Sequence, residues 1–173
     1  MNILCNNRSM NTLFLMHFLS EAPPPEGKSL YNEDNLHITF LSHVECENEY
    51  DKNLFIKRIE QVAESTKPFI MKPNGQALFG VNQNKPVITL SDGKYEGKAL
   101  HLNLLAAAFK TGLFSTEPER FLGMNFSPHM TVYKEQQSSD FNQEIWVNHI
   151  SLVSHIGGFG SGEVEITKNL FFH

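Results

Sequence analysis

The chain has 173 residues, of which 40% are hydrophobic, so it is long enough for one domain with a sizeable core. Its formal net charge of -5 at pH 7 argues against extended duplex nucleic acid as a partner, because such binding needs a basic surface, but it is compatible with a nucleotide or a short RNA. With only two cysteines, Cys5 and Cys46, and no CxxC or Cys/His zinc spacing, the composition excludes a disulfide framework and favours the reducing cytoplasm.

The N-terminal segment is polar and rich in asparagine, and residues 1–11 are expected to form a loose leader. Arg8 precedes a short apolar run, as in a signal peptide, but His17 interrupts that run and no A-x-A-like cleavage site follows. No apolar stretch approaches the roughly 18 residues of a membrane-spanning helix. We therefore expect a cytoplasmic protein with no membrane partner.

The first half of the chain alternates strand and helix patterns. "TLFLMHFL" (12–19) predicts a buried strand, and the three prolines within 20–29 predict a loop. "LHITFLSHV" (36–44), rich in apolar and β-branched residues, predicts a second strand. The next segment, 49–65, predicts a helix because its apolar residues fall on one helical face: Leu54, Phe55, Ile59, Val62 and Ala63.

Three short apolar runs within 67–91, separated by Asn-Gly and Asn-Lys-Pro, predict an antiparallel group of strands. A second helix is expected over 94–112, closed by Gly112. Three later segments have strand character: 126–134, 144–155 and 163–172. Together these elements predict an α+β fold with two helices and about eight strands.

Two stretches, "HITF" (37–40) and "HMTV" (129–132), repeat one pattern of histidine, apolar residue, threonine and apolar residue. Side chains alternate between the faces of a strand, so each stretch places its histidine and threonine on one face, about 6.6 Å apart along the backbone. With eight histidines and eight threonines, about 0.4 His-x-Thr triplets are expected by chance, so two with matching apolar flanks indicate a shared site.

This set of side chains suits phosphodiester chemistry. One neutral imidazole can accept a proton from water or from a ribose hydroxyl, and a protonated imidazole can donate one to the leaving oxygen. Two hydroxyl groups can donate hydrogen bonds to the non-bridging oxygens of the phosphate.

"NLHITFLS" (35–42) and "FSPHMTVYK" (126–134) resemble the paired His-x-Thr motifs of the 2H phosphoesterase superfamily. This superfamily includes LigT-like RNA 2′,3′-cyclic phosphodiesterases, bacterial 2′-5′ RNA ligases and 2′-5′ oligoadenylate phosphodiesterases. "NTLFLMHF" (11–18) and "WVNHISLVS" (146–154) are similar to the family's first and penultimate strands. The resemblance thus covers residues 12–172, although only the two motifs are distinctive.

The resemblance implies a single bilobed α+β domain over 1–173, with two pseudo-symmetric lobes of antiparallel strands and helices around a central cleft. It also implies that His37 and His129 are the acid and base, that Thr39 and Thr131 bind the phosphate, and that no metal or other cofactor is needed. The sequence does not assign the acid and the base individually. A proline-containing segment, 20–35, occupies an interval that is commonly helical in the family, so the cleft is expected to be more open there.

Further candidates follow from strand parity and residue type. Tyr133 and His43 share the parity of the motif histidines, so both are candidates for lining the cleft. Phe126 is a third candidate, because its ring could stack on a nucleobase. For the two aromatic residues, Tyr133 and Phe126, packing in the core is the alternative role. His149 and His155 share one strand face, but no carboxylate has a spacing that completes a metal site. "GGFGSG" (157–162) precedes a strand pattern instead of a helix, which favours a flexible hairpin over a phosphate-binding loop.

The predicted activity is hydrolysis of a 2′,3′-cyclic phosphate or a 2′-5′ linkage in a small nucleotide or RNA end, by a monomer. One alternative keeps the site and changes the substrate to a cyclic di- or trinucleotide second messenger. Another is a protein that binds a nucleotide without turning it over. A pure binder has no need of two titrating groups, which favours the enzyme.

Overall fold

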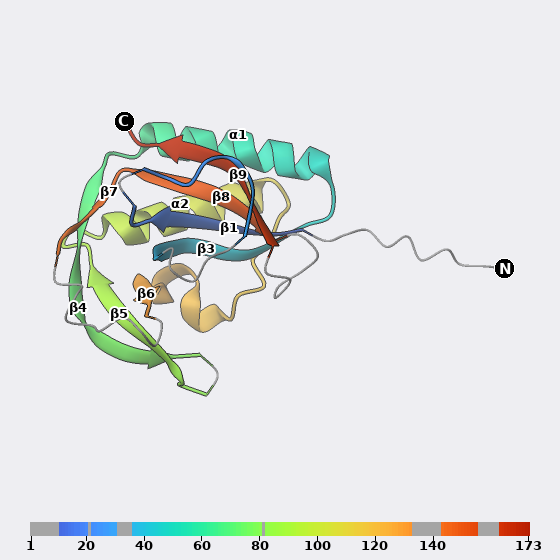
Figure 1. Ribbon diagram of the computed structural model, residues 1–173. Helices are drawn as coiled ribbons and strands as arrows, with labels where there is room; N and C mark the ends of the chain where they lie inside the picture. Colours follow the sequence, from blue (N-terminus) through green and yellow to red (C-terminus); the bar gives the residue numbers. More distant parts are fainter. Residues whose placement is uncertain (1–10, 21, 31–35, 81, 133–142, 156–162) are drawn as a thin grey trace.

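The computed structural model shows nine antiparallel strands in one curled sheet, with order β2-β9-β8-β1-β3-β6-β5-β4-β7, and two helices (Figure 1). The residues that the structure describes are 11–20, 22–30, 36–80, 82–132, 143–155 and 163–173. In the N-terminal half the elements are β1 (Asn11–Phe18), β2 (Gly27–Leu30), β3 (His37–Cys46), α1 (Glu49–Ser65), β4 (Phe69–Phe79) and β5 (Lys85–Ser91). In the C-terminal half they are α2 (Glu96–Lys110), β6 (His129–Thr131), β7 (Ile145–Val147), β8 (His149–His155) and β9 (Glu163–Phe171), with short 3-10 turns at Glu119–Phe121 and Gly123–Asn125.

The α+β class is confirmed, and both helices lie where the apolar spacing predicted them. The Asn48 side chain accepts a hydrogen bond from the backbone N–H of Asp51, which fixes the start of α1. Gly112 follows the last turn of α2 with a φ of 76°, a conformation that favours glycine at this position.

Three predicted boundaries are wrong. The first two apolar runs of 67–91 form one strand, β4, because Asn74-Gly75 makes a bulge, with a φ of 113° at Gly75, and does not make a turn. The last residues of the predicted loop 20–29 belong to β2, which begins after the prolines and pairs with β9. The segment 144–155 is two strands, β7 and β8, which pair with β4 and with β1 and β9 respectively.

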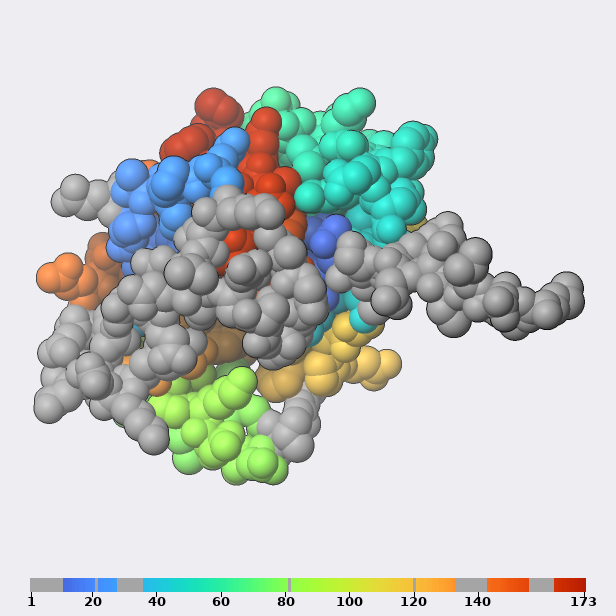
Figure 2. Space-filling view, turned by 45° about the vertical axis from the view of Figure 1, so that its right-hand side comes forward, coloured from blue at the N-terminus to red at the C-terminus, as the bar shows by residue number. Residues whose placement is uncertain are grey.

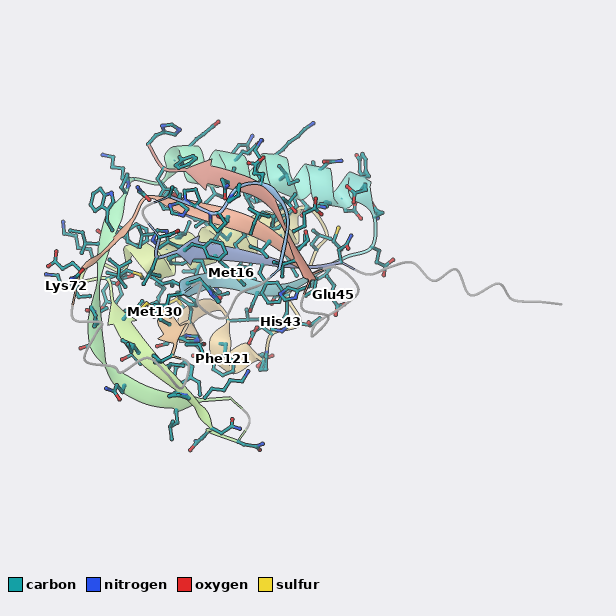
Figure 3. The ribbon with its side chains drawn as sticks, in the orientation of Figure 1. Met16, His43, Glu45, Lys72, Phe121 and Met130 are labelled. Atoms are coloured by element: carbon teal, nitrogen blue, oxygen red, sulfur yellow. The ribbon has the colours of Figure 1, made fainter. Side chains whose placement is uncertain are left out.

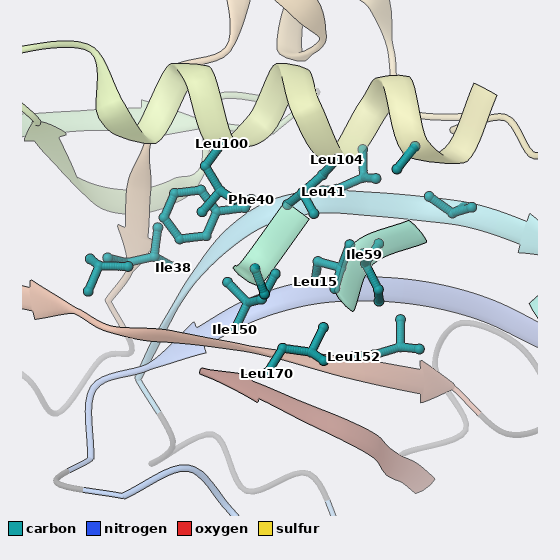
Figure 4. Packing of buried hydrophobic residues seen from close by; sticks show 14 of the residues in the cluster. Leu15, Ile38, Phe40, Leu41, Ile59, Leu100, Leu104, Ile150, Leu152 and Leu170 are labelled. Carbon is teal, nitrogen blue, oxygen red and sulfur yellow. The ribbon is translucent and has the colours of Figure 1, made fainter. Parts of the chain in front are cut away.

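Both helices pack on one face of the sheet and enclose the main core (Figure 4). Phe55 and Ile59 of α1 and Leu100 and Leu104 of α2 are fully buried against the strands. The strands contribute Leu13, Leu15, Ile38, Phe40, Ile150 and Leu152. Burial of this apolar surface is the main force that holds β3, the strand of the first motif, in place.

The sheet curls so that α1 and the β4–β5 hairpin lie at opposite ends of the molecule (Figure 2). A second, smaller cluster of buried apolar side chains lies on the face away from the helices, and it includes Phe14, Met16 and Phe18 of β1. This smaller cluster lies on β1, β8 and β9, next to the first motif strand, β3.

Candidate active site

The strands that carry the two motifs are neighbours in the sheet. β3 pairs with β6 through Ile38 opposite Met130, and both of these side chains are buried in the main core. Because the strands are antiparallel, this register places His37 beside Thr131 and Thr39 beside His129, all on the opposite face. From strand geometry, the two histidines lie diagonally, about 8 Å apart at their Cβ atoms.

A cavity of about 340 Å³ opens on that face, and all four motif side chains line it. Each of the four is partly exposed, unlike the apolar residues between them. A nucleotide-sized ligand needs a cavity of this order. The structure thus brings together the two imidazoles and two hydroxyls that were predicted as a site.

His129 is held in a defined orientation. Its Nδ1–H donates to the carbonyl oxygen of Ser127 at 2.9 Å, so in the neutral ring Nε2 carries the lone pair. Burial lowers the pKa of His129, and this effect outweighs the opposing effects of the Ser127 carbonyl and of the negative charge on Glu117. The imidazole also packs on Phe79, with ring centroids 4.6 Å apart. Burial therefore favours a neutral His129.

His37 lies at the start of β3, opposite Phe18 of β1 in the sheet. The rings of His37 and Phe18 are 5.9 Å apart at their centroids. Phe18 itself is buried in the smaller apolar cluster, so it supports one side of the His37 ring. The first motif is therefore positioned by the packing of β1 beneath it.

His43 also lines the cavity, but not on a regular strand. It has a φ of 52°, and the pairing of β3 with β1 slips between Leu13 and Leu15. Strand parity alone would therefore not have placed this side chain. Its Nδ1 lies 2.5 Å from Oε2 of Glu117, and Ser42 Oγ donates to the same carboxylate oxygen. The bonds from these partners hold the pKa of Glu117 below its usual value, against the opposing effect of burial.

The other sequence candidates fall into different places. Phe126 lines the cavity but is buried, and it stacks on His101 with ring centroids 4.2 Å apart. Both nitrogens of His101 are bonded, Nδ1 to the Phe40 carbonyl and Nε2 to the backbone N–H of Gly123, so it is a core histidine. Tyr133 and the glycine-rich segment 157–162 lie outside the described residues.

The two histidines of β8 are separated. His155 lines the cavity and packs against Phe14, whereas His149 is buried and its ring contacts His17, with centroids 4.5 Å apart. In the part of the chain that the structure describes, no three His, Cys, Asp or Glu side chains are grouped so that they could hold a metal ion. None of the helices described is both long enough and apolar enough to cross a membrane.

Sequence reasoning missed several residues of the cavity. Glu117 follows α2 in a loop and reaches β3 only through the fold, and no local pattern identifies it. Phe79 and Phe121, whose rings are 5.9 Å apart, form a second aromatic pair beside His129. The exposed Lys85 also borders the cavity. Figure 3 shows Met16, His43 and Phe121 on the same side of the sheet, away from α1.

The structure is a curled antiparallel sheet with two helices on one face, and its His-x-Thr motifs lie on adjacent strands. Solved structures confirm this fold. LigT of E. coli in complex with 3′-AMP has a TM-score of 0.60, with 16% identity over 95% of this chain and 98% of that chain. A second structure, described as a phosphoesterase, has a TM-score of 0.62, with 17% identity over 94% of this chain and 98% of that chain.

LigT has also been solved with NADP+, and that structure aligns with a TM-score of 0.62, with 17% identity over 95% of this chain and 98% of that chain. No protein-family model and no curated protein sequence matches the chain. At this level of identity the similarity establishes the fold, and the chemistry has to be argued from the site.

Proposed function

We propose that the chain is a phosphodiesterase that hydrolyses a 2′,3′-cyclic phosphate or a 2′-5′ phosphodiester in a small nucleotide or RNA end, without a metal. The observation that carries this proposal is the pairing of Ile38 with Met130, which directs both His-x-Thr motifs into one cavity. The similar fold of LigT, which has been solved with 3′-AMP, supports a nucleotide as the ligand.

In this mechanism, His129 is the base. Its neutral Nε2 accepts a proton from water, and the water oxygen attacks phosphorus. The bond between phosphorus and a ribose oxygen breaks, and protonated His37 donates a proton to that oxygen. Thr39 and Thr131 donate hydrogen bonds to the non-bridging oxygens, whose negative charge grows in the transition state. His129 then releases its proton to solvent and His37 takes one up, which restores their starting states.

The pH dependence of kcat/KM is expected to follow the titration of His129 on its acidic limb. Because burial lowers the pKa of His129, the base stays neutral below pH 6.5, the ordinary value for histidine. As pH falls through the lowered pKa, His129 becomes protonated and the rate falls. A pH profile of kcat/KM should therefore have an acidic limb with an apparent pKa below 6.5. A midpoint above 6.5 would assign the base role to another group.

Replacing Thr39 or Thr131 with valine should lower kcat by about a hundredfold, because the variant keeps the shape of the side chain and loses a donor to the transition-state oxygens. Thr39→Ser and Thr131→Ser are the matched controls, since they keep the hydroxyl, and they should stay within a few-fold of the wild type. Steady-state kinetics on a 2′,3′-cyclic nucleotide measures both. Equal losses in the serine and valine variants would refute a hydrogen-bonding role.

The substrate is tested by incubating the protein, with a chelator present, with 2′,3′-cyclic mononucleotides, 2′-5′ oligoadenylate and cyclic dinucleotides, and by separating the products chromatographically. We expect cleavage of one of the first two classes. Exclusive cleavage of cyclic dinucleotides would favour a second-messenger phosphodiesterase. Thermal stabilisation by these ligands with no product formed would favour a nucleotide-binding protein.

A further inference from the structure

The cavity contains a carboxylate that the proposed reaction does not use. Glu117 lines the same cavity as the motif residues, and its side chain is 18% exposed. A negative charge this close to a phosphate site disfavours the substrate unless it is paired. His43 and Ser42 bond one oxygen of this carboxylate, which leaves the second oxygen to accept from a donor group on the substrate.

Two contacts fix the carboxylate and a third fixes its backbone. Ser42 Oγ and His43 Nδ1 both bond Oε2, and the backbone N–H of Glu117 donates to Ser115 Oγ at 3.2 Å. Ser115 Oγ in turn donates to the carbonyl oxygen of Ser42. Both lone pairs of Oε2 are thus engaged, whereas the structure gives Oε1 no partner among the described residues. Oε1 is a fixed acceptor at the edge of a nucleotide-sized cavity.

Glu117 lies at a suitable distance from the phosphate donors. Its anchor Ser42 is three residues beyond Thr39 on β3, which is at most about 10 Å because the strand is irregular there. This distance is comparable to the span of a nucleotide from its phosphate to the far edge of its base. The half-buried rings of Phe79 and Phe121 line the cavity, Phe79 packs on His129, and both rings offer surfaces on which a base could stack.

The chemistry of Glu117 discriminates among the bases. An ionised carboxylate only accepts hydrogen bonds. Guanine presents two adjacent donors, N1–H and the 2-amino group, whereas adenine and cytosine each place a ring-nitrogen acceptor beside their amino group. Uracil has one N–H between two carbonyl acceptors. Guanine is therefore the base that offers two adjacent donors to the one open oxygen, which accepts both in a bifurcated hydrogen bond.

We propose that Glu117 reads the base of the substrate and makes the site selective for guanine. This inference rests on the proposed function for the position of the phosphate. Guanosine 2′,3′-cyclic phosphate and its product, the guanosine monophosphate, are the expected ligands. The amino edge of the base faces Glu117 Oε1, and the phosphate lies between His37 and His129.

The proposed preference for guanine is tested with guanosine, inosine and adenosine nucleotides, because inosine keeps N1–H and lacks the 2-amino group. In the wild type we expect kcat/KM for the 2′,3′-cyclic phosphates to fall at least tenfold from guanosine to adenosine, with inosine between them. Glu117→Gln should reduce the guanosine-to-adenosine ratio to within about twofold. Because the ratio is compared within each variant, a uniform effect of the removed charge on phosphate binding cancels.

Glu119→Gln is the control, since it removes the same charge two residues away on an exposed side chain outside the cavity, and it should leave the ratio unchanged. A wild type that shows no preference, or that prefers adenosine, overturns the inference, as does a guanosine preference that survives in Glu117→Gln.

Calorimetric binding of 3′-GMP and 3′-AMP separates this inference from the proposed function. A guanine preference in binding with no turnover supports Glu117 as the base reader and contradicts only the reaction. Turnover without a base preference contradicts only this inference.

Discussion

Replacing either motif histidine with alanine is expected to reduce kcat by about a thousandfold or more, the contribution typical of a positioned acid or base. His37 and His129 occupy diagonal corners of the paired motif strands. In the proposed reaction each serves one end of the phosphodiester, so neither replaces the other. Initial rates on a 2′,3′-cyclic nucleotide, measured for His37→Ala, His129→Ala and the double variant, test this. Because the two groups act in one step, the double variant should lose little more than either single variant.

The controls distinguish chemistry from folding. His173→Ala changes an exposed histidine at the C-terminus and should keep full activity. Circular dichroism should show unchanged secondary structure in all variants, since both motif histidines are partly exposed and neither is part of the main core. Retention of more than a tenth of the rate by either alanine variant would remove that residue from the acid–base pair.

The protein is also expected to lose stability in mild acid through a buried histidine pair outside the cavity. His17 is 3% exposed, and its Nδ1–H donates to the carbonyl oxygen of His149 at 3.0 Å. Burial, followed by the nearby charge of His149, lowers the pKa of His17 to about 4. The unfolded chain keeps a histidine pKa near 6.5 and therefore binds more protons below that pH.

The free energy of unfolding should accordingly fall as pH drops from about 6.5 towards 4, and the contribution of His17 alone should reach about 3 kcal/mol. Burial lowers the pKa of His149 and of His101 as well, which adds to the loss in the same direction. Urea denaturation at several pH values measures this dependence. His17→Gln keeps an amide donor and does not titrate, so its stability should depend less on pH. An identical pH dependence in the wild type and in His17→Gln would contradict this assignment.

The paired motifs could be predicted from the sequence because their information is local. Alternation along a strand places His37 with Thr39 and His129 with Thr131, and the apolar residues between them mark the buried face. The structure agrees, because Ile38 and Met130 are buried in the main core. The family resemblance implied that the two motifs, 92 positions apart, share one central cleft, but only the structure shows that their strands pair directly.

Other features depend on contacts that no local pattern encodes. Glu117 meets His43 across 74 positions, and the bulge that turns His43 into the cavity arises from its pairing with β1. Asn74-Gly75 has the composition of a hairpin turn, yet the pairing of β4 with β5 continues past it. In each case contacts between distant segments, and not the local sequence, determined the local structure, as is common for short strand segments.

The most direct test of the account is the regiochemistry of hydrolysis by the wild type. A 2′,3′-cyclic nucleotide is incubated with the protein in water enriched in oxygen-18, and the product is followed by phosphorus NMR. Because one base and one acid are fixed on opposite sides of the phosphate, we expect a single monoester, either 2′ or 3′, with one solvent oxygen on phosphorus. Formation of both monoesters would contradict in-line attack between His129 and His37, as would the absence of hydrolysis of both the cyclic nucleotides and 2′-5′ oligoadenylate.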